Sequence, residues 1–92
     1  MITTETLTAS EECQRATVAA ETAIDSMHGM GGHTAAMQCG ATAVSNADYA
    51  IESARLAGDD FADTLAPFVA RAEAARVAGQ REVDWYYGPN RP

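Results

Sequence analysis

Apolar residues recur at intervals of three and four along most of the chain, which is the spacing of one face of an α-helix. In the first such segment this face consists of Cys13, Ala16, Ala20, Ala23 or Ile24, and Met27. Thr8 or Ser10 precedes it, and a side-chain oxygen there would accept a free backbone N–H of the first turn. The pattern therefore predicts a first helix over about residues 10–28.

A second periodic segment follows the glycine-rich sequence at residues 29–33. Its larger and smaller residues alternate in a heptad seam made of Met37, Gly40, Val44, Ala47, Ile51 and Ala54. We expect a helix over about 34–57, started by a cap at His33 and Thr34 and ended by Gly58. The glycines at 29, 31 and 32 can adopt left-handed conformations, so they should reverse the chain between two antiparallel helices.

Bulkier apolar residues mark a third segment, with Phe61, Leu65, Phe68, Ala72 and Ala75 on one side and Val69 and Val77 beside them. The predicted helix covers about 60–79 and ends near Gly79. Pro67 fits either the first turn of a helix capped by Thr64 or a kink in a helix that begins near Asp60, and we favour the kink. Residues 80–92 contain Gly and Pro and predict an extended tail.

These elements predict an all-α protein with a single domain over residues 1–92. The expected fold is a three-helix up-down-up bundle built on an Ala-rich antiparallel helical hairpin. Alanine supplies 20 of the 92 residues, so much of the 47% hydrophobic fraction consists of single methyl groups. Burial of apolar surface contributes roughly 25 cal/mol per Å², and a methyl group buries little area. The chain is also short, so its hydrophobic core is small. We therefore expect self-association into a homo-oligomer.

The chain has a formal net charge of −7, and most of its acidic residues lie in residues 1–63. That segment contains ten acidic residues but only two basic ones, Arg15 and Arg55. An acidic surface argues against direct binding to nucleic acid or to an anionic membrane, because both attract cationic proteins. It favours a basic partner protein, or a nucleic-acid-binding one for which the chain acts as an acidic decoy. A solvated acidic surface without a partner is the alternative.

The first ten residues lack a basic n-region and an apolar h-region, and no apolar run is long enough for a membrane span. We therefore expect a soluble, cytoplasmic protein. In a helical hairpin, Cys13 and Cys39 lie about nine residues out of register, or about 13 Å at 1.5 Å per residue. That separation is too large for a disulfide, so both thiols should be free, as in a reducing compartment.

Two groups of residues are candidates for binding a partner protein. Trp85, Tyr86 and Tyr87 are adjacent aromatic residues on a Pro-flanked segment, and such residues supply a large contact area at a low entropy cost. The structural alternative is that Trp85 folds over the end of the bundle. Asp59, Asp60 and Asp63 form an acidic corner between the second and third helices, where helix capping is the alternative role.

The sequence offers no motif for catalysis: it lacks a nucleophile elbow, an HExxH motif and a phosphate-binding loop. We therefore expect no enzyme activity and no cofactor. The expected function is a non-enzymatic protein–protein interaction module, a small acidic regulator or inhibitor of a larger protein assembly.

One alternative comes from the ligand types between Met27 and Cys39. His33 and Met37 are four residues apart on one helical face, and His28 and Cys39 lie close in sequence. Imidazole, thioether and thiolate ligands together suit copper in its Cu(I) state. The structural alternative places the methionines in the core and the histidines at helix ends.

Overall fold

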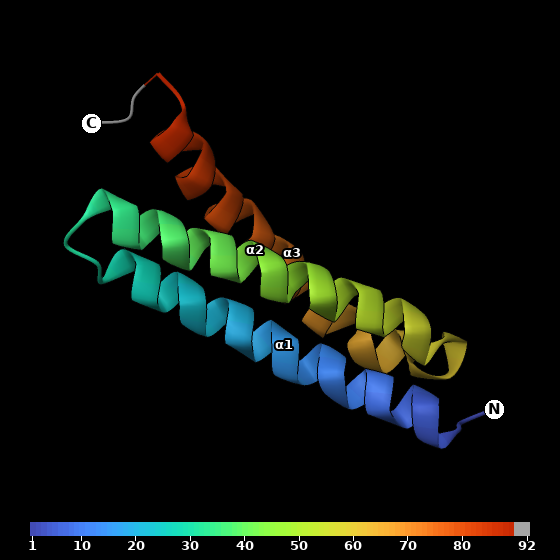
Figure 1. Cartoon of the computed structure of the whole chain (residues 1–92). Coiled ribbons are helices and arrows are strands. Elements are labelled where there is room, and N and C mark those ends of the chain that lie inside the picture. The colour runs from blue at the N-terminus through green and yellow to red at the C-terminus, as the bar shows by residue number, and fades with distance from the viewer. Residues whose placement is uncertain (90–92) are drawn as a thin grey trace.

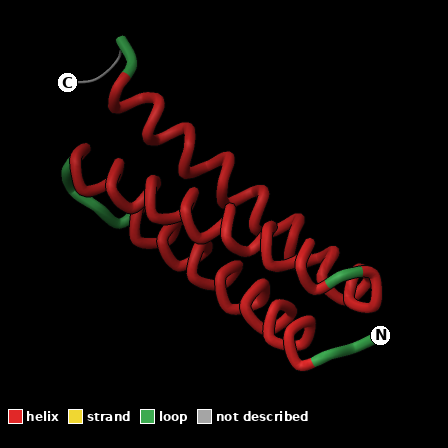
Figure 2. The backbone as a smooth tube through the Cα atoms, turned by 45° about the vertical axis from the view of Figure 1, so that its right-hand side comes forward, coloured by secondary structure: helices red, strands yellow, loops and turns green. Residues whose placement is uncertain are grey.

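In the computed structural model of the chain, which describes residues 1–89, three long α-helices run antiparallel to their neighbours in sequence (Figure 1). Helix α1 spans Thr4–His28, α2 spans His33–Ala57 and α3 spans Ala62–Tyr87. A short 3₁₀ helix, η1, spans Asp59–Phe61 and joins α2 to α3. The described residues contain no strand, and the predicted all-α, three-helix up-down-up bundle is confirmed (Figure 2).

Helix α1 begins at Thr4 rather than near residue 10. The reason is a reciprocal cap at Thr3 and Thr6, which provides hydrogen bonds for the first turn. The Thr6 backbone N–H donates to Oγ1 of Thr3 at 3.1 Å, and the Thr3 N–H donates to Oγ1 of Thr6 at 2.8 Å. The predicted caps therefore lie inside the helix, and Ser10 is buried.

The connection between α1 and α2 differs from the prediction in its backbone conformation. Gly29 ends α1 with φ of −89°, and its N–H donates to the carbonyl of Ser26 at 3.1 Å. Gly32 precedes α2 with an extended φ of −127°. Among the described residues, only Gly58 has positive φ, at 82°. The prediction that the turn glycines adopt left-handed conformations was therefore wrong. Residues 29–32 reverse the chain without any positive φ.

The inner face of α1 is confirmed, with Cys13, Ala16, Ala20 and Met27 all buried. The inner face of α2 matches the predicted seam only in part, because Gly40 and Ala47 are buried whereas Met37, Val44, Ile51 and Ala54 are partly exposed. Its buried residues are Ala36, Gly40, Ala43, Ala47, Ala50, Ser53 and Ala57. Helix α2 packs against α1 and α3 more extensively than those two pack together, so its smallest residues face both neighbours. Of the larger seam residues, Val44 lies beside Gly79 and Ile51 packs at the edge of the core.

Helix α3 places Leu65, Ala72 and Ala75 in the core, and Phe61 and Phe68 pack at its edge. The 3₁₀ helix begins at residue 59, close to the predicted start, and Pro67 lies inside α3. The tail prediction was wrong over residues 80–87, which are helical; residues 90–92 lie outside the described part. Gly79 does not end the helix. It lies inside α3, where the lack of a side chain allows α2 to approach closely.

Within residues 1–89, none of the helices has the length and apolar character that a membrane span needs.

Candidate functional site

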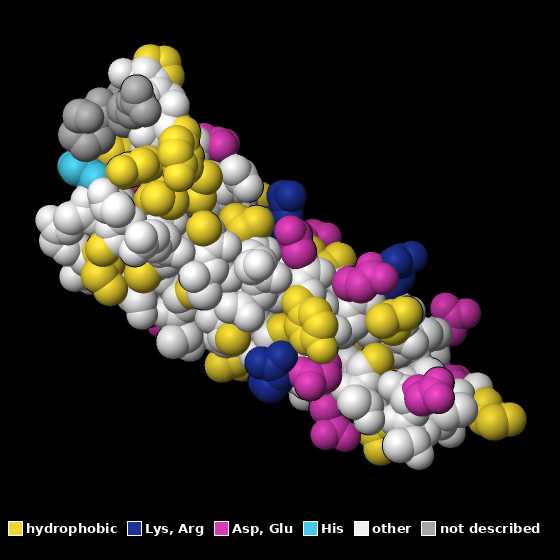
Figure 3. Space-filling model, in the orientation of Figure 1, with side chains coloured by type: hydrophobic (Ala, Val, Ile, Leu, Met, Phe, Trp, Pro, Cys, Tyr) yellow, Lys and Arg dark blue, Asp and Glu magenta, His cyan; other side chains and the backbone are white. Residues whose placement is uncertain are grey.

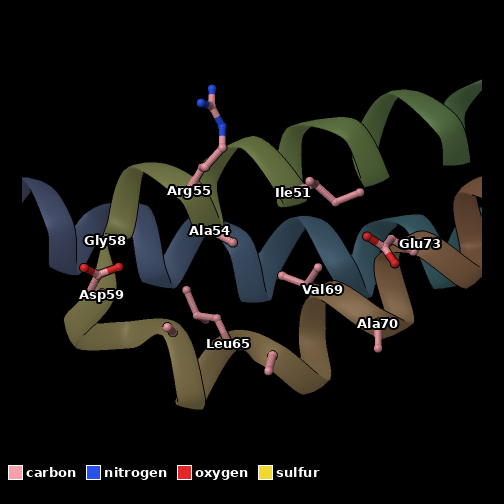
Figure 4. A pocket seen from close by; sticks show the side chains of 11 residues that line it. Ile51, Ala54, Arg55, Gly58, Asp59, Leu65, Val69, Ala70 and Glu73 are labelled. Atoms are coloured by element: carbon pink, nitrogen blue, oxygen red, sulfur yellow. The ribbon is translucent and has the colours of Figure 1, made fainter.

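An apolar groove of about 560 Å³ lies between the second half of α2 and the first half of α3 (Figure 4). Leu65 and Val69 point from α3 toward α2, and Ile51 lies on the opposite wall. Leu65 is only 1% exposed and forms the floor, whereas Val69 and Ile51 are partly exposed. The groove therefore joins the hydrophobic core to the surface.

The groove follows from residue spacing on two packed helices. Its lining residues on α3 lie three or four positions apart and include Ala62, Ala66 and Ala70; on α2 they include Ala54. Alanine at these positions leaves space that larger side chains would fill. Gly58 allows the sharp exit from α2, because φ of 82° is strained for residues with a side chain. This exit returns α3 alongside α2.

Carboxylates lie at the two ends of this groove. Figure 4 shows Asp59 at one end and Glu73 at the other. Arg55 is the one basic residue in the lining, and its guanidinium points away from the groove. Arg55 is held by Glu52, with Nη2 2.6 Å from Oε1. The rim of the groove therefore carries a net negative charge.

The positive charge of the molecule is largely neutralised by ion pairs. Within residues 1–89, four of the five arginines pair with acids: Arg15 with Glu12, Arg55 with Glu52, Arg71 with Glu21 and Arg76 with Asp48. Most of the remaining charged groups are carboxylates. In Figure 3, most acidic side chains on the visible face lie over the half of the molecule that carries the N-terminus.

The six residues predicted to bind a partner are divided between the two ends of a molecule measuring 52 × 20 × 17 Å. Asp59, Asp60 and Asp63 lie at the corner between α2 and α3, and Asp59 lines the groove. Asp60 pairs with the N-terminal amine of Met1 at 2.6 Å. The aromatic residues end α3 at the opposite end (Figure 1). The structure therefore does not bring the two groups into one site.

The aromatic residues contact the beginning of α2. The ring of Trp85 lies 4.6 Å from the ring of His33, centroid to centroid. The Tyr86 hydroxyl lies 3.2 Å from Oγ1 of Thr34, and Tyr87 is 64% exposed. The structural role predicted for Trp85, packing over the bundle end, is thus present. Partner binding by Trp85, Tyr86 and Tyr87 stays a prediction.

The structure does not gather the four predicted copper ligands into one cluster, and Met37 is partly buried on α2. The ring of His33 lies against Trp85 with the two planes tilted by 37°, while Cys39 lines a shallow groove between α1 and α2. His28 lines a different groove beside α3. Residues 1–89 contain no cluster of three or more His, Cys, Asp and Glu side chains suited to a metal ion. Copper binding stays a prediction, which a Cu(I) competition titration of the reduced protein and of the His33→Ala variant would test.

The two cysteines are free thiols in different environments. Cys13 is fully buried, and burial raises the pKa of its thiol, although a hydrogen bond with Thr17 opposes that shift. A raised pKa keeps this thiol protonated at neutral pH, which makes it a poor nucleophile. Cys13 is therefore a core residue, whereas Cys39 is partly exposed.

The sequence interpretation missed the groove itself. It singled out Asp59 but treated Leu65 and Val69 only as core residues. The available signal was the second row of alanines on α3, which makes its apolar face wider than one packed neighbour needs. Comparison with protein-family models, with curated proteins and with solved structures finds no match. The functional assignment therefore depends on the residues of the groove.

Proposed function

We propose that the protein is a non-enzymatic protein–protein interaction module that binds a partner through the groove between α2 and α3. The observation that carries this proposal is the open apolar lining, in which partly exposed Val69 and Ile51 flank buried Leu65. An apolar centre surrounded by a charged rim is typical of protein-binding surfaces. The lining contains no arrangement of nucleophile and base that would favour a reaction.

A small module of this kind acts by occupying a surface of a larger assembly, as a regulator or inhibitor. The two free thiols support a cytoplasmic location, because the cytoplasm is a reducing compartment that keeps cysteines as thiols. Self-association of the module is supported by exposed apolar side chains outside the groove, among them Val18 on α1 and Tyr49 and Leu56 on α2.

A variant that fills the groove tests the proposal. Ala66 is exposed and lines the groove, so Ala66→Phe places a ring where a partner would sit. Ala41 is exposed on α2 and is not among the lining residues, so Ala41→Phe is the matched control. Tagged wild type and both variants would be used to capture proteins from the native lysate, followed by quantitative mass spectrometry.

We expect a defined partner to be retained by the wild type and by Ala41→Phe, and to be lost with Ala66→Phe. Circular dichroism of each variant shows whether its helices are intact. Equal retention by all three folded proteins would contradict binding through this groove.

A further inference from the structure

We infer, on the basis of the groove's proposed role, that its occupant is a basic amphipathic helix of a partner protein, with cationic residues at both ends of an apolar stripe. The first argument is length. The lining on α3 runs from Ala62 to Glu73, which is about 17 Å at 1.5 Å per residue. This length matches about three turns of a partner helix.

The shape of the groove favours a helix over an extended peptide. Both walls are α-helices, in which most backbone N–H and C=O groups are hydrogen-bonded within the helix. An extended segment would therefore find few backbone partners in the lining, whereas a helix brings its own. Small residues such as Ala62 and Ala66 allow a helix to approach closely and fit its side chains between those of α2 and α3.

Charge complementarity identifies which helix would bind. Asp59 and Glu73 mark the two ends of the groove, and neither pairs with an arginine within residues 1–89. Arg55, the basic residue of the lining, is turned away and held by Glu52. A partner that supplies one cation at each end would neutralise both carboxylates.

A second copy of this chain satisfies the same requirement poorly. It would bring a further net charge of −7, and within the described part four of its five arginines are engaged in ion pairs. Repulsion between the two acidic rims would oppose the contact. The cationic residues are therefore expected on a different protein.

Three synthetic helical peptides with one apolar stripe test this inference. The peptides differ only at the two ends of the stripe, which carry Arg, Gln or Glu. Each has a fluorophore, and binding to the full chain is measured by fluorescence anisotropy at low and high salt. We expect the Arg peptide to bind about five- to tenfold more tightly than the Gln peptide, and the Glu peptide to bind most weakly. High salt should reduce these differences, because it screens exposed charges.

Two double variants with the same change in net charge distinguish two effects on peptide affinity: that of the rim carboxylates and that of the overall electrostatic field of the protein. Asp59→Asn with Glu73→Gln removes the rim carboxylates. Glu11→Gln with Asp25→Asn removes two exposed acids of α1 that do not line the groove. The rim variant should lose about fivefold or more in affinity for the Arg peptide, and the α1 variant less than about twofold.

Equal binding of the Arg and Gln peptides, or equal losses in the two double variants, would overturn the basic-helix inference. Failure of all three peptides would also overturn it. In each case, loss of the lysate partner with Ala66→Phe would still support the groove as a docking site. A dimer in analytical ultracentrifugation that Ala66→Phe dissociates would overturn the inference in favour of a second copy.

Discussion

Gly79 and Gly40 are the residues at which the backbones of α2 and α3 come into direct contact. A Cβ atom on Gly40 would lie 2.8 Å from the carbonyl oxygen of Gly79. One on Gly79 would clash with the Gly40 carbonyl and lie 3.2 Å from Cβ of Ala43. The nearest atoms are backbone, so a larger residue requires one helix to move away. The glycines therefore set the distance between the two helices.

We expect Gly79→Ala to lower the free energy of unfolding by about 1–3 kcal/mol, because it overpacks this contact. The loss should occur although alanine is the better helix former by about 1 kcal/mol. Urea unfolding followed by circular dichroism measures the change. Gly31→Ala is the control, since a Cβ there meets nothing within 4 Å and should alter stability by less than about 0.5 kcal/mol. Similar midpoints for the two variants would contradict a tight crossing.

Among the helices, α3 departs furthest from its local sequence preferences. It continues through Pro67 and Gly79 for 26 residues. Pro67 has no N–H to donate to the carbonyl of Asp63, so one helical hydrogen bond is missing. Leu65 in the core holds the helix before the proline, and Trp85 packs near its end against His33. Tertiary packing therefore keeps α3 helical where propensity alone would end it.

Replacing Pro67 with alanine should raise the free energy of unfolding by about 1–3 kcal/mol, because it restores the missing N–H and removes the ring from the helix interior. Pro67 is exposed, so little packing is lost. Chemical unfolding of the variant is compared with that of Pro89→Ala, a matched change outside the helices with no expected effect. An unchanged or lower stability of Pro67→Ala would contradict a destabilising role of this proline.

At the scale of the whole molecule, ion pairs tie α3 to both other helices. Arg71 on α3 contacts Glu21 on α1, with Nε 3.0 Å from Oε2. Arg76 on α3 contacts Asp48 on α2, with Nε 2.7 Å from Oδ1. All four side chains are substantially exposed, so each pair contributes little at neutral pH. The pair between Arg71 and Glu21 nevertheless makes the docking of α3 depend on pH.

The hydrogen bond and charge of Arg71 lower the pKa of Glu21 below its ordinary value of 4.5. A lowered folded-state pKa gives stability that is present above 4.5 and is lost as the pH falls through the folded-state value. Between about pH 6 and about pH 3, the wild type should therefore lose slightly more stability than Glu21→Gln. Urea unfolding at several pH values tests this, with Glu11→Gln as the control. Parallel pH profiles for the wild type and Glu21→Gln would contradict it.

The sequence predicted the helices better than their ends and faces. The inner face of α1 was correct because Cys13, Ala16 and Ala20 meet a neighbour on one side of the helix. The seam of α2 was only partly correct: its small residues Gly40 and Ala47 are buried, but larger residues such as Ile51 lie at the edge of the core. The centre, between two close helices, is occupied by small residues: glycine, alanine and Ser53. The groove was missed for a related reason: residue spacing shows that Val69 is apolar, but not whether another helix covers it.

The sequence by itself determined that the protein is helical, that three helices alternate in direction, and that its net charge is negative. These properties depend on local periodicity, short connections and composition, which the chain carries in any conformation. Only the tertiary structure decided which face of α2 is buried, why Gly79 lies inside a helix, and where apolar surface remains open between Asp59 and Glu73. Those features depend on contacts between residues distant in sequence, and such contacts exist only once the helices have packed.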